Sequence, residues 1–174
     1  MLRSSFLALA LLAACSPAPN SQAPAQDAAT TAEAPADPNA AALGAVPQTG
    51  AWTLRTDEGV TAAGFGAPES EYLLTISCEM PSGKLTLIYE RELAPDQDTT
   101  LRIVTPVQTL DLPARSFNEG LPSVTAEVLD SAPAKIALIS MLGAPTDRFA
   151  VDVNGESSVF PWADAVSQAL IACR

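Results

Sequence analysis

Carboxylates and cysteines are the side chains of this chain that could take part in chemistry, because the chain contains no histidine. Without imidazole, Ser-His-Asp and Cys-His nucleophile systems and histidine-ligated metal sites are excluded. A pair of carboxylates could still cleave a glycosidic bond. Such sites normally lie in aromatic-lined clefts, however, and only 5% of the residues are aromatic. The candidate acids are Glu71, Glu79, Glu90, Glu92, Glu119 and Glu127.

Other short motifs lack the spacing that their chemistry needs. Ser82 and Lys84 are too close together for a Ser-x-x-Lys nucleophile. The segment 152–156 (DVNGE) has no closing glutamate of a calcium loop, so we expect a hairpin turn there. The Gly64-Phe65-Gly66 tripeptide lacks the rest of a dinucleotide fingerprint. We therefore predict no catalytic residue, no metal site and no cofactor.

Length and charge narrow the possible classes of protein. The chain has 174 residues, with 9 Lys+Arg against 20 Asp+Glu, for a formal charge of −11. This length suits one domain of ordinary size. A nucleic-acid binder needs cations to displace counterions from phosphate, so the acidic balance argues against one.

The N-terminus has the features of an export signal. Arg3 precedes an apolar run at residues 6–12, which is too short to span a bilayer. The following Leu12-Ala13-Ala14-Cys15 resembles the lipobox of bacterial lipoproteins. That resemblance implies cleavage before Cys15, lipidation of its thiol and, with Ser16 next, an outer-membrane lipoprotein facing the periplasm. The alternative is an ordinary secretory signal with a chance cysteine.

Residues 16–49 differ in composition from the rest of the chain. Alanine and proline dominate, and Leu43 and Val46 are the only large apolar residues. We expect a disordered tether, because this segment cannot bury enough surface to offset its chain entropy. The predicted organisation is therefore a signal peptide at 1–14, a lipidated Cys15 with its tether at 15–49, and a globular domain at 50–174.

The globular part is predicted to be mainly β, an antiparallel β-sandwich or small barrel with a C-terminal helix. Apolar and polar residues alternate in several short runs separated by turn residues. The first run would place Tyr72 on one face with Leu74, Ile76 and Cys78. Asn154-Gly155 is a strong signal for a tight hairpin. The expected strands are 72–78, 84–90, 100–105, 108–112, 123–129, 148–153 and 158–160, with weaker candidates at 52–54 and 60–65.

Two segments interrupt the strand pattern. Residues 134–142 follow Ser131 as the expected cap and Pro133 as a first-turn proline, and they end at Gly143. This favours a short helix, although a buried strand fits the same apolar run. Pro161 is expected to open a C-terminal helix at about 162–172, with Trp162 on its apolar face.

Cys78 and Cys173 remain once Cys15 is lipidated. Both fall on the predicted buried faces of their elements, and an even pair in an exported chain indicates a disulfide. Two buried free thiols are the alternative. No CxxC motif is present, so the predicted disulfide is structural.

Two further resemblances concern the globular part. The segments 73–78, 83–87 and 148–153 and the ending Ala172-Cys173-Arg174 together resemble small exported proteins of unknown function in alphaproteobacteria. A tyrosine and a cysteine on one strand of a lipid-anchored chain are similar to membrane-bound c-type lysozyme inhibitors. That second resemblance implies an inhibitory loop, which the segment 113–121 would have to supply.

We therefore predict a lipid-anchored cell-envelope protein that is a non-catalytic binding or envelope-support module. Its expected partners are the membrane, through the lipid, and another envelope protein, but no nucleic acid. A lysozyme-inhibitor-like protein is the second hypothesis, and a carboxylate-dependent envelope hydrolase is the third.

Overall fold

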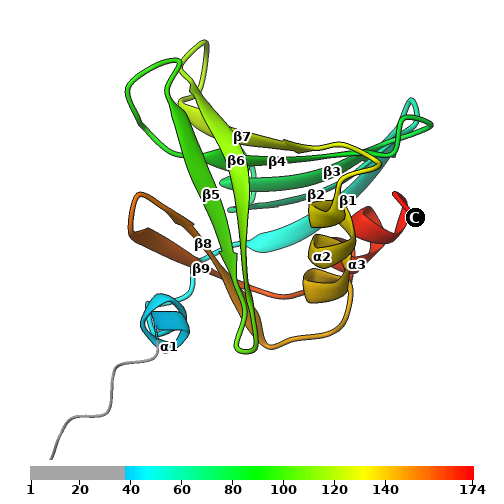
Figure 1. Ribbon diagram of the computed structural model, residues 1–174. Coiled ribbons are helices and arrows are strands. Elements are labelled where there is room, and N and C mark those ends of the chain that lie inside the picture. Colours follow the sequence, from blue (N-terminus) through cyan, green and yellow to red (C-terminus); the bar gives the residue numbers. More distant parts are fainter. Residues whose placement is uncertain (1–37) are drawn as a thin grey trace, which may run out of the picture. The chain divides into compact units, whose positions relative to one another are not determined.

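A computed structural model describes residues 38–174 of the chain. In this part, nine antiparallel strands form one sheet that curls into a half-barrel (Figure 1). The strand order is β1-β2-β3-β4-β7-β6-β5-β8-β9. The strands are β1 (Ala51–Asp57), β2 (Val60–Gly66), β3 (Leu74–Glu79), β4 (Lys84–Glu90), β5 (Asp98–Val104), β6 (Thr109–Phe117), β7 (Ser123–Val128), β8 (Arg148–Val153) and β9 (Glu156–Pro161). The mainly β prediction is confirmed, and the curled single sheet matches its barrel form more closely than a sandwich.

Tight turns between neighbouring strands set the register of the sheet. Glu58 and Gly59 join β1 to β2 with φ values of 46° and 84°. Asn154 and Gly155 join β8 to β9 with φ values of 56° and 81°. Two successive positive φ angles are what a two-residue hairpin needs, because they match the twist of the flanking strands. The Asn154-Gly155 prediction is thus confirmed.

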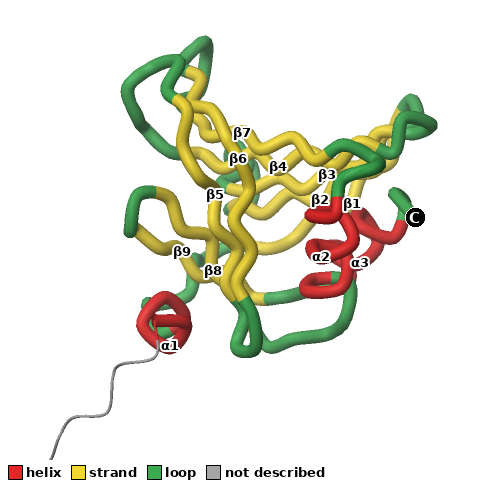
Figure 2. Tube along the Cα trace, in the orientation of Figure 1, coloured by secondary structure: helices red, strands yellow, loops and turns green. Residues whose placement is uncertain are grey.

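Two helices cover part of the concave side of the sheet (Figure 2). Helix α2 (Pro133–Leu142) packs on α3 (Asp164–Ile171), and α3 lies over β1, β2 and β3. The carbonyl groups at the end of α2 have no partner within the helix. Trp162 Nε1 donates to the carbonyl oxygen of Leu142 at 2.8 Å, and Ser167 Oγ donates to that of Gly143 at 2.7 Å. Helix α3 and the segment that leads into it therefore hold the end of α2.

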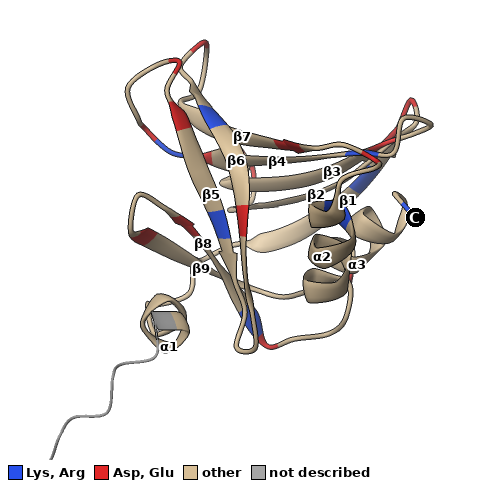
Figure 3. Cartoon of the chain, in the orientation of Figure 1, with Lys and Arg blue, Asp and Glu red and all other residues tan. Residues whose placement is uncertain are grey.

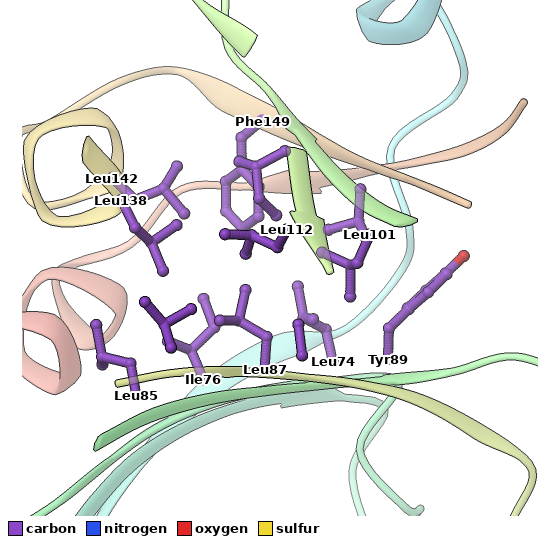
Figure 4. Close-up of a cluster of buried hydrophobic side chains, with 14 of the residues drawn as sticks. Leu74, Ile76, Leu85, Leu87, Tyr89, Leu101, Leu112, Leu138, Leu142 and Phe149 are labelled. Atoms are coloured by element: carbon purple, nitrogen blue, oxygen red, sulfur yellow. The ribbon is translucent and has the colours of Figure 1, made fainter. Parts of the chain in front are cut away.

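The main core lies between the two sides of the curled sheet. Alternate residues of β3 and β4 point inward, where they meet side chains from β5, β6, β8 and α2 (Figure 4). Phe160 is at the centre of an aromatic group, with ring centroids 5.3 to 6.4 Å from those of Phe65, Trp52, Tyr89 and Phe149. The alternation seen in the sequence thus marks the face that is removed from water.

Side-chain contacts connect β9, at one end of the sheet, to strands β1 and β4 in its other half. Trp52 Nε1 on β1 donates to the carbonyl oxygen of Pro161 on β9 at 2.6 Å. Tyr89 on β4 and Ser158 on β9 share a hydrogen bond of 2.8 Å between their hydroxyls. An ion pair between Arg91 and Glu156 adds a third link. The sheet order contains no β1–β9 pairing among the described residues, so these contacts hold the curl.

The folded part begins earlier than the boundary expected at Gly50. Helix α1 (Pro38–Leu43) lies within the predicted tether, and Pro47 forms a parallel bridge with Val159 of β9. Ala42 and Leu43 pack on Val104, Ala150 and Val159, a small apolar cluster separate from the main core. The expectation of disorder is therefore wrong for residues 38–49, because three strands together supply an apolar surface for them.

Details of the other elements also differ from the prediction. Helix α3 begins at Asp164, because Pro161 is the last residue of β9 and Trp162 is in the connecting segment. Helix α2 is confirmed, but its N-cap is Ala132 and makes no side-chain capping bond, so the expected Ser131 cap is wrong. Strand β3 begins at Leu74, so Tyr72 precedes it. The ring of Tyr72 packs on Gly64 of β2. Gly64 pairs with Thr75, which is on the convex face of the sheet. Tyr72 is thus not on the face that holds Leu74.

Candidate functional site

A hollow of about 540 Å³ lies beside α1 on the convex face of the sheet. We call it the α1 hollow. One side is formed by alanines of α1 and the following turn, and the other by side chains of β5, β6, β8 and β9. Its lining residues are Asn39, Ala41, Ala42, Ala45, Arg102, Val104, Thr109, Asp152, Gly155 and Ser157.

Strand pairing places an apolar row and a polar row side by side at this hollow. Val104 pairs with Ala150, and Ala150 pairs with Val159, which forms the apolar row under α1. The polar row is displaced from this apolar row by two residues. It consists of Arg102 on β5, flanked by its strand partners Asp111 on β6 and Asp152 on β8. Residues two apart on a strand share a face, so both rows face α1. Figure 3 shows charged positions on these neighbouring strands.

The charges of the polar row are already engaged. Arg102 donates from Nε to Asp111 Oδ1 at 2.6 Å and from its terminal nitrogen to Oδ2 at 3.0 Å. The hydrogen bond from Arg102 lowers the pKa of Asp111, and the same bond raises the pKa of Arg102. Asp152 accepts from the Gly155 backbone N–H at 3.1 Å and from Ser157 Oγ at 2.6 Å. Groups held in place in this way can form hydrogen bonds to a polar ligand.

Helix α1 is held at this hollow by contacts outside itself. A helix of six residues is not stable alone, because nucleation costs more than so few bonds return. Thr109 Oγ1 donates to Asn39 Oδ1 at 2.9 Å, and the Gln48 backbone N–H donates to the Val159 carbonyl at 2.8 Å. Leu43 and Ala42 add the apolar contacts described above. The segment 38–48 is therefore attached to β6 and β9.

Cys78 and Cys173 form the predicted disulfide, with an S–S distance of 2.04 Å and a Cα–Cα distance of 5.5 Å. Both residues are buried. The bond joins strand β3 to the residues that follow α3, across 95 positions of sequence. The structural disulfide is thus confirmed. Cys15 and its lipobox lie outside the described residues.

The six candidate glutamates do not form a common cleft in the described part of the chain. Glu79 and Glu127 are neighbours, because both pair with Lys84. Their carboxylate oxygens lie 3.5 and 3.2 Å from Lys84 Nζ. The pKa of Lys84 is raised, mainly by its hydrogen bond to Glu127 and by the negative charge of Glu127. The negative charge of Glu79 raises it further. Glu71 and Glu119 lie in the β2–β3 and β6–β7 connections, at separate hollows. Glu90 ends β4, and Glu92 follows it.

The segment expected to supply an inhibitory loop is largely strand. Residues 113–117 belong to β6, and Arg115 pairs with both Asp98 and Thr125. The connection to β7 is limited to residues 118–122. A protruding loop over 113–121 is therefore not what the chain forms.

A buried lysine is the feature that the sequence analysis missed. Lys135 on α2 is only 5% exposed, and its Nζ forms an ion pair with Asp130 in the loop after β7. Gly83 (φ 66°) lies against both groups, where a Cβ would be 2.5 Å from Asp130 Oδ1 and 3.1 Å from Lys135 Nζ. One signal was available, because Lys135 interrupts the apolar run of its helix. This pair joins the loop after β7 to α2, and the β3–β4 turn lies against it.

We expect Asp130→Asn to lower the free energy of unfolding by about 1–3 kcal/mol, because it leaves the Lys135 ammonium buried without its carboxylate. The double variant Asp130→Asn/Lys135→Met should return to within about 1 kcal/mol of the original protein, since it removes the buried charge as well. Urea unfolding followed by circular dichroism measures both. An unchanged stability in the single variant would show that the ion pair does not matter to the fold.

Comparison of the chain with family models, with curated proteins and with solved structures finds no match. Among residues 38–174, no three His, Cys, Asp or Glu side chains are grouped so that they could hold a metal ion. In the same range, no helix is long and apolar enough to cross a membrane.

Proposed function

We propose that this chain is a lipid-anchored protein of the cell envelope, in the outer membrane facing the periplasm, and that its domain is a non-catalytic binding module. The observation that carries the proposal is the Cys78–Cys173 disulfide. Disulfides persist in oxidising compartments outside the cytoplasm. The bond uses two of the three cysteines and leaves Cys15, which directly follows the apolar N-terminal run.

A leftover cysteine in an exported chain needs an explanation, because an exposed free thiol is reactive. Acylation of Cys15 provides one, and it agrees with the small residues Ala13 and Ala14 before it. Several acyl chains make membrane attachment effectively permanent, at about 0.8 kcal/mol for each buried methylene.

Binding rather than catalysis is supported by the α1 hollow. Its lining carboxylate Asp152 accepts from Ser157 and from a backbone N–H, and its lining cation Arg102 is paired with Asp111, so these groups hold fixed positions from which they can orient a polar ligand. The lysozyme-inhibitor and hydrolase hypotheses have no comparable support. Residues 113–117 are strand, Glu79 and Glu127 are both engaged by Lys84, and Glu71 and Glu119 lie at separate hollows.

The anchor is tested by metabolic labelling with a palmitate analogue. We expect the original protein to take up label and to fractionate with the outer membrane. Cys15→Ser should lose both properties, because it removes the thiol that accepts the lipid. Cys173→Ser is the matched control, since it removes a different thiol and should keep the label. An unlabelled original protein, with the Cys15→Ser variant in the same fractions, would contradict the proposal.

A further inference from the structure

Strand β1 is an open edge of the sheet. Its seven residues pair with β2 along their whole length, without a bulge or a proline. Six of them are exposed, and Trp52 is half-buried. On its other side, β1 makes no backbone hydrogen bond with any residue of 38–174. The opposite edge, β9, is covered in part by Pro47 and Gln48.

The backbone groups that face outward from β1 follow from the pairing of β2. The carbonyl oxygens of Gly59 and Phe65 accept hydrogen bonds from the backbone N–H groups of Met80 and Leu73. The backbone N–H and C=O groups of the odd-numbered residues of β2 therefore face β3. The even-numbered groups of β2 therefore face β1, where they meet Ala51, Thr53, Arg55 and Asp57. In an antiparallel ladder, bonding alternates along the strand. Trp52, Leu54 and Thr56 thus present their backbone groups to an incoming strand.

The two charges of β1 have no salt-bridge partner in the described part of the protein. Six cations of this part pair with carboxylates, namely Lys84, Arg91, Arg102, Arg115, Lys135 and Arg148. Arg55 instead lies over the ring of Tyr72, 5.4 Å from its centroid. Asp57, two residues further along the same face, forms no ion pair within residues 38–174 either. An acidic protein thus keeps an unpaired Arg and an unpaired Asp together on its open edge.

We infer that this edge binds a second copy of the chain through antiparallel β1–β1 pairing about Thr56. In that register Thr56 lies opposite its counterpart, and each Arg55 lies opposite Asp57 of the other copy. Both Arg55–Asp57 positions are non-hydrogen-bonded pairs, whose side chains approach each other most closely. All four charges are then paired.

The neighbouring registers are less favourable. Pairing centred on Arg55 would place the two guanidinium groups opposite each other, and like charges directly opposite destabilise a sheet. Pairing centred on Leu54 would bring the partner against Trp52, whose indole is bonded to Pro161 at the junction with β9. The half of β1 around Thr56 avoids that junction. In this register the paired residues of β1 are Arg55, Thr56 and Asp57, because Leu54 would lie opposite Glu58 of the turn. The pairing covers the end of the open edge next to that turn.

Sedimentation equilibrium of the purified full chain tests this interface, with the variants compared under identical conditions. We expect a dimer whose dissociation constant rises about tenfold or more in Arg55→Asp and in Asp57→Arg, since each variant converts two attractions into two repulsions. The double variant R55D/D57R should dimerise like the original. An equimolar mixture of the two single variants should also dimerise, because all the acids would then face all the arginines.

Arg174→Asp is the matched control. It changes the net charge as much as Arg55→Asp does. Like Arg55, Arg174 forms no ion pair within the described residues. This variant should leave the dimer intact. Circular dichroism of every variant should be unchanged. A monomeric original protein would overturn the inference and leave the edge to another occupant. A dimer that survives both single variants equally would place the interface elsewhere and overturn it too.

Discussion

Replacing Cys78 and Cys173 together by alanine is expected to lower the free energy of unfolding by about 4–5 kcal/mol. The disulfide closes a loop of 95 residues, and closing a long loop removes much conformational entropy from the unfolded chain. Since whole domains are stable by only about 5–15 kcal/mol, the loss is a large share of the total. Urea unfolding at a fixed temperature measures it.

The reduced original protein provides the control for this first experiment. We expect a reductant to lower its stability toward that of the double variant, while the double variant itself should not respond. The end of α3 should open first, because Cys173 connects it to β3. Hydrogen exchange would show this as faster exchange in residues 164–172. Equal stability with and without the bond would mean that packing alone holds the helix.

Phe160→Ala is the second substitution with a large expected effect, a loss of about 3–5 kcal/mol. Phe160 is fully buried, and its ring contacts the rings of Trp52, Phe65, Tyr89 and Phe149. Truncation removes apolar burial and leaves a cavity that the rigid strands around it cannot fill. Because Phe160 lies where β9 meets β1, the curl of the sheet should loosen as well.

A matched substitution separates this effect from the loss of any phenylalanine. Phe117 at the end of β6 is 43% exposed, so Phe117→Ala should cost less than about 1 kcal/mol. Phe160→Leu should cost about 1.5 kcal/mol or less, since it conserves most of the volume. Thermal unfolding of the three variants under one condition gives the comparison. Similar losses at positions 117 and 160 would contradict the central role of the aromatic group.

Much of the fold could be predicted because its signals are local. Alternation along a strand depends only on which face is buried, so the runs around Leu74, Leu87 and Val151 identified their strands correctly. The first run also placed Leu74, Ile76 and Cys78 correctly on one buried face. Asn154-Gly155 specified its turn, because both residues tolerate positive φ. The disulfide partners could be paired because the expectation of a lipidated Cys15 in an exported chain left Cys78 and Cys173 as an even pair.

Errors occurred where a distant partner decides the local structure. Tyr72 continues the alternation of β3, but Gly64 on the neighbouring strand leaves room for its ring on the convex face. Trp162 has helical spacing with Val166, but its indole bonds to the carbonyl of Leu142 from an extended segment. No pattern within either segment contains these contacts.

By itself, the sequence determined the mainly β class, the positions of most elements, the pairing of Cys78 with Cys173 and the absence of histidine chemistry. Only the tertiary structure decided that residues 38–48 belong to the fold, that Arg102 lies between Asp111 and Asp152, and that β1 is an open edge. The physical reason is the range of the interactions. Turn conformation and alternation depend on adjacent residues, whereas an apolar patch, a row of charges or a free edge exists only after distant strands have paired.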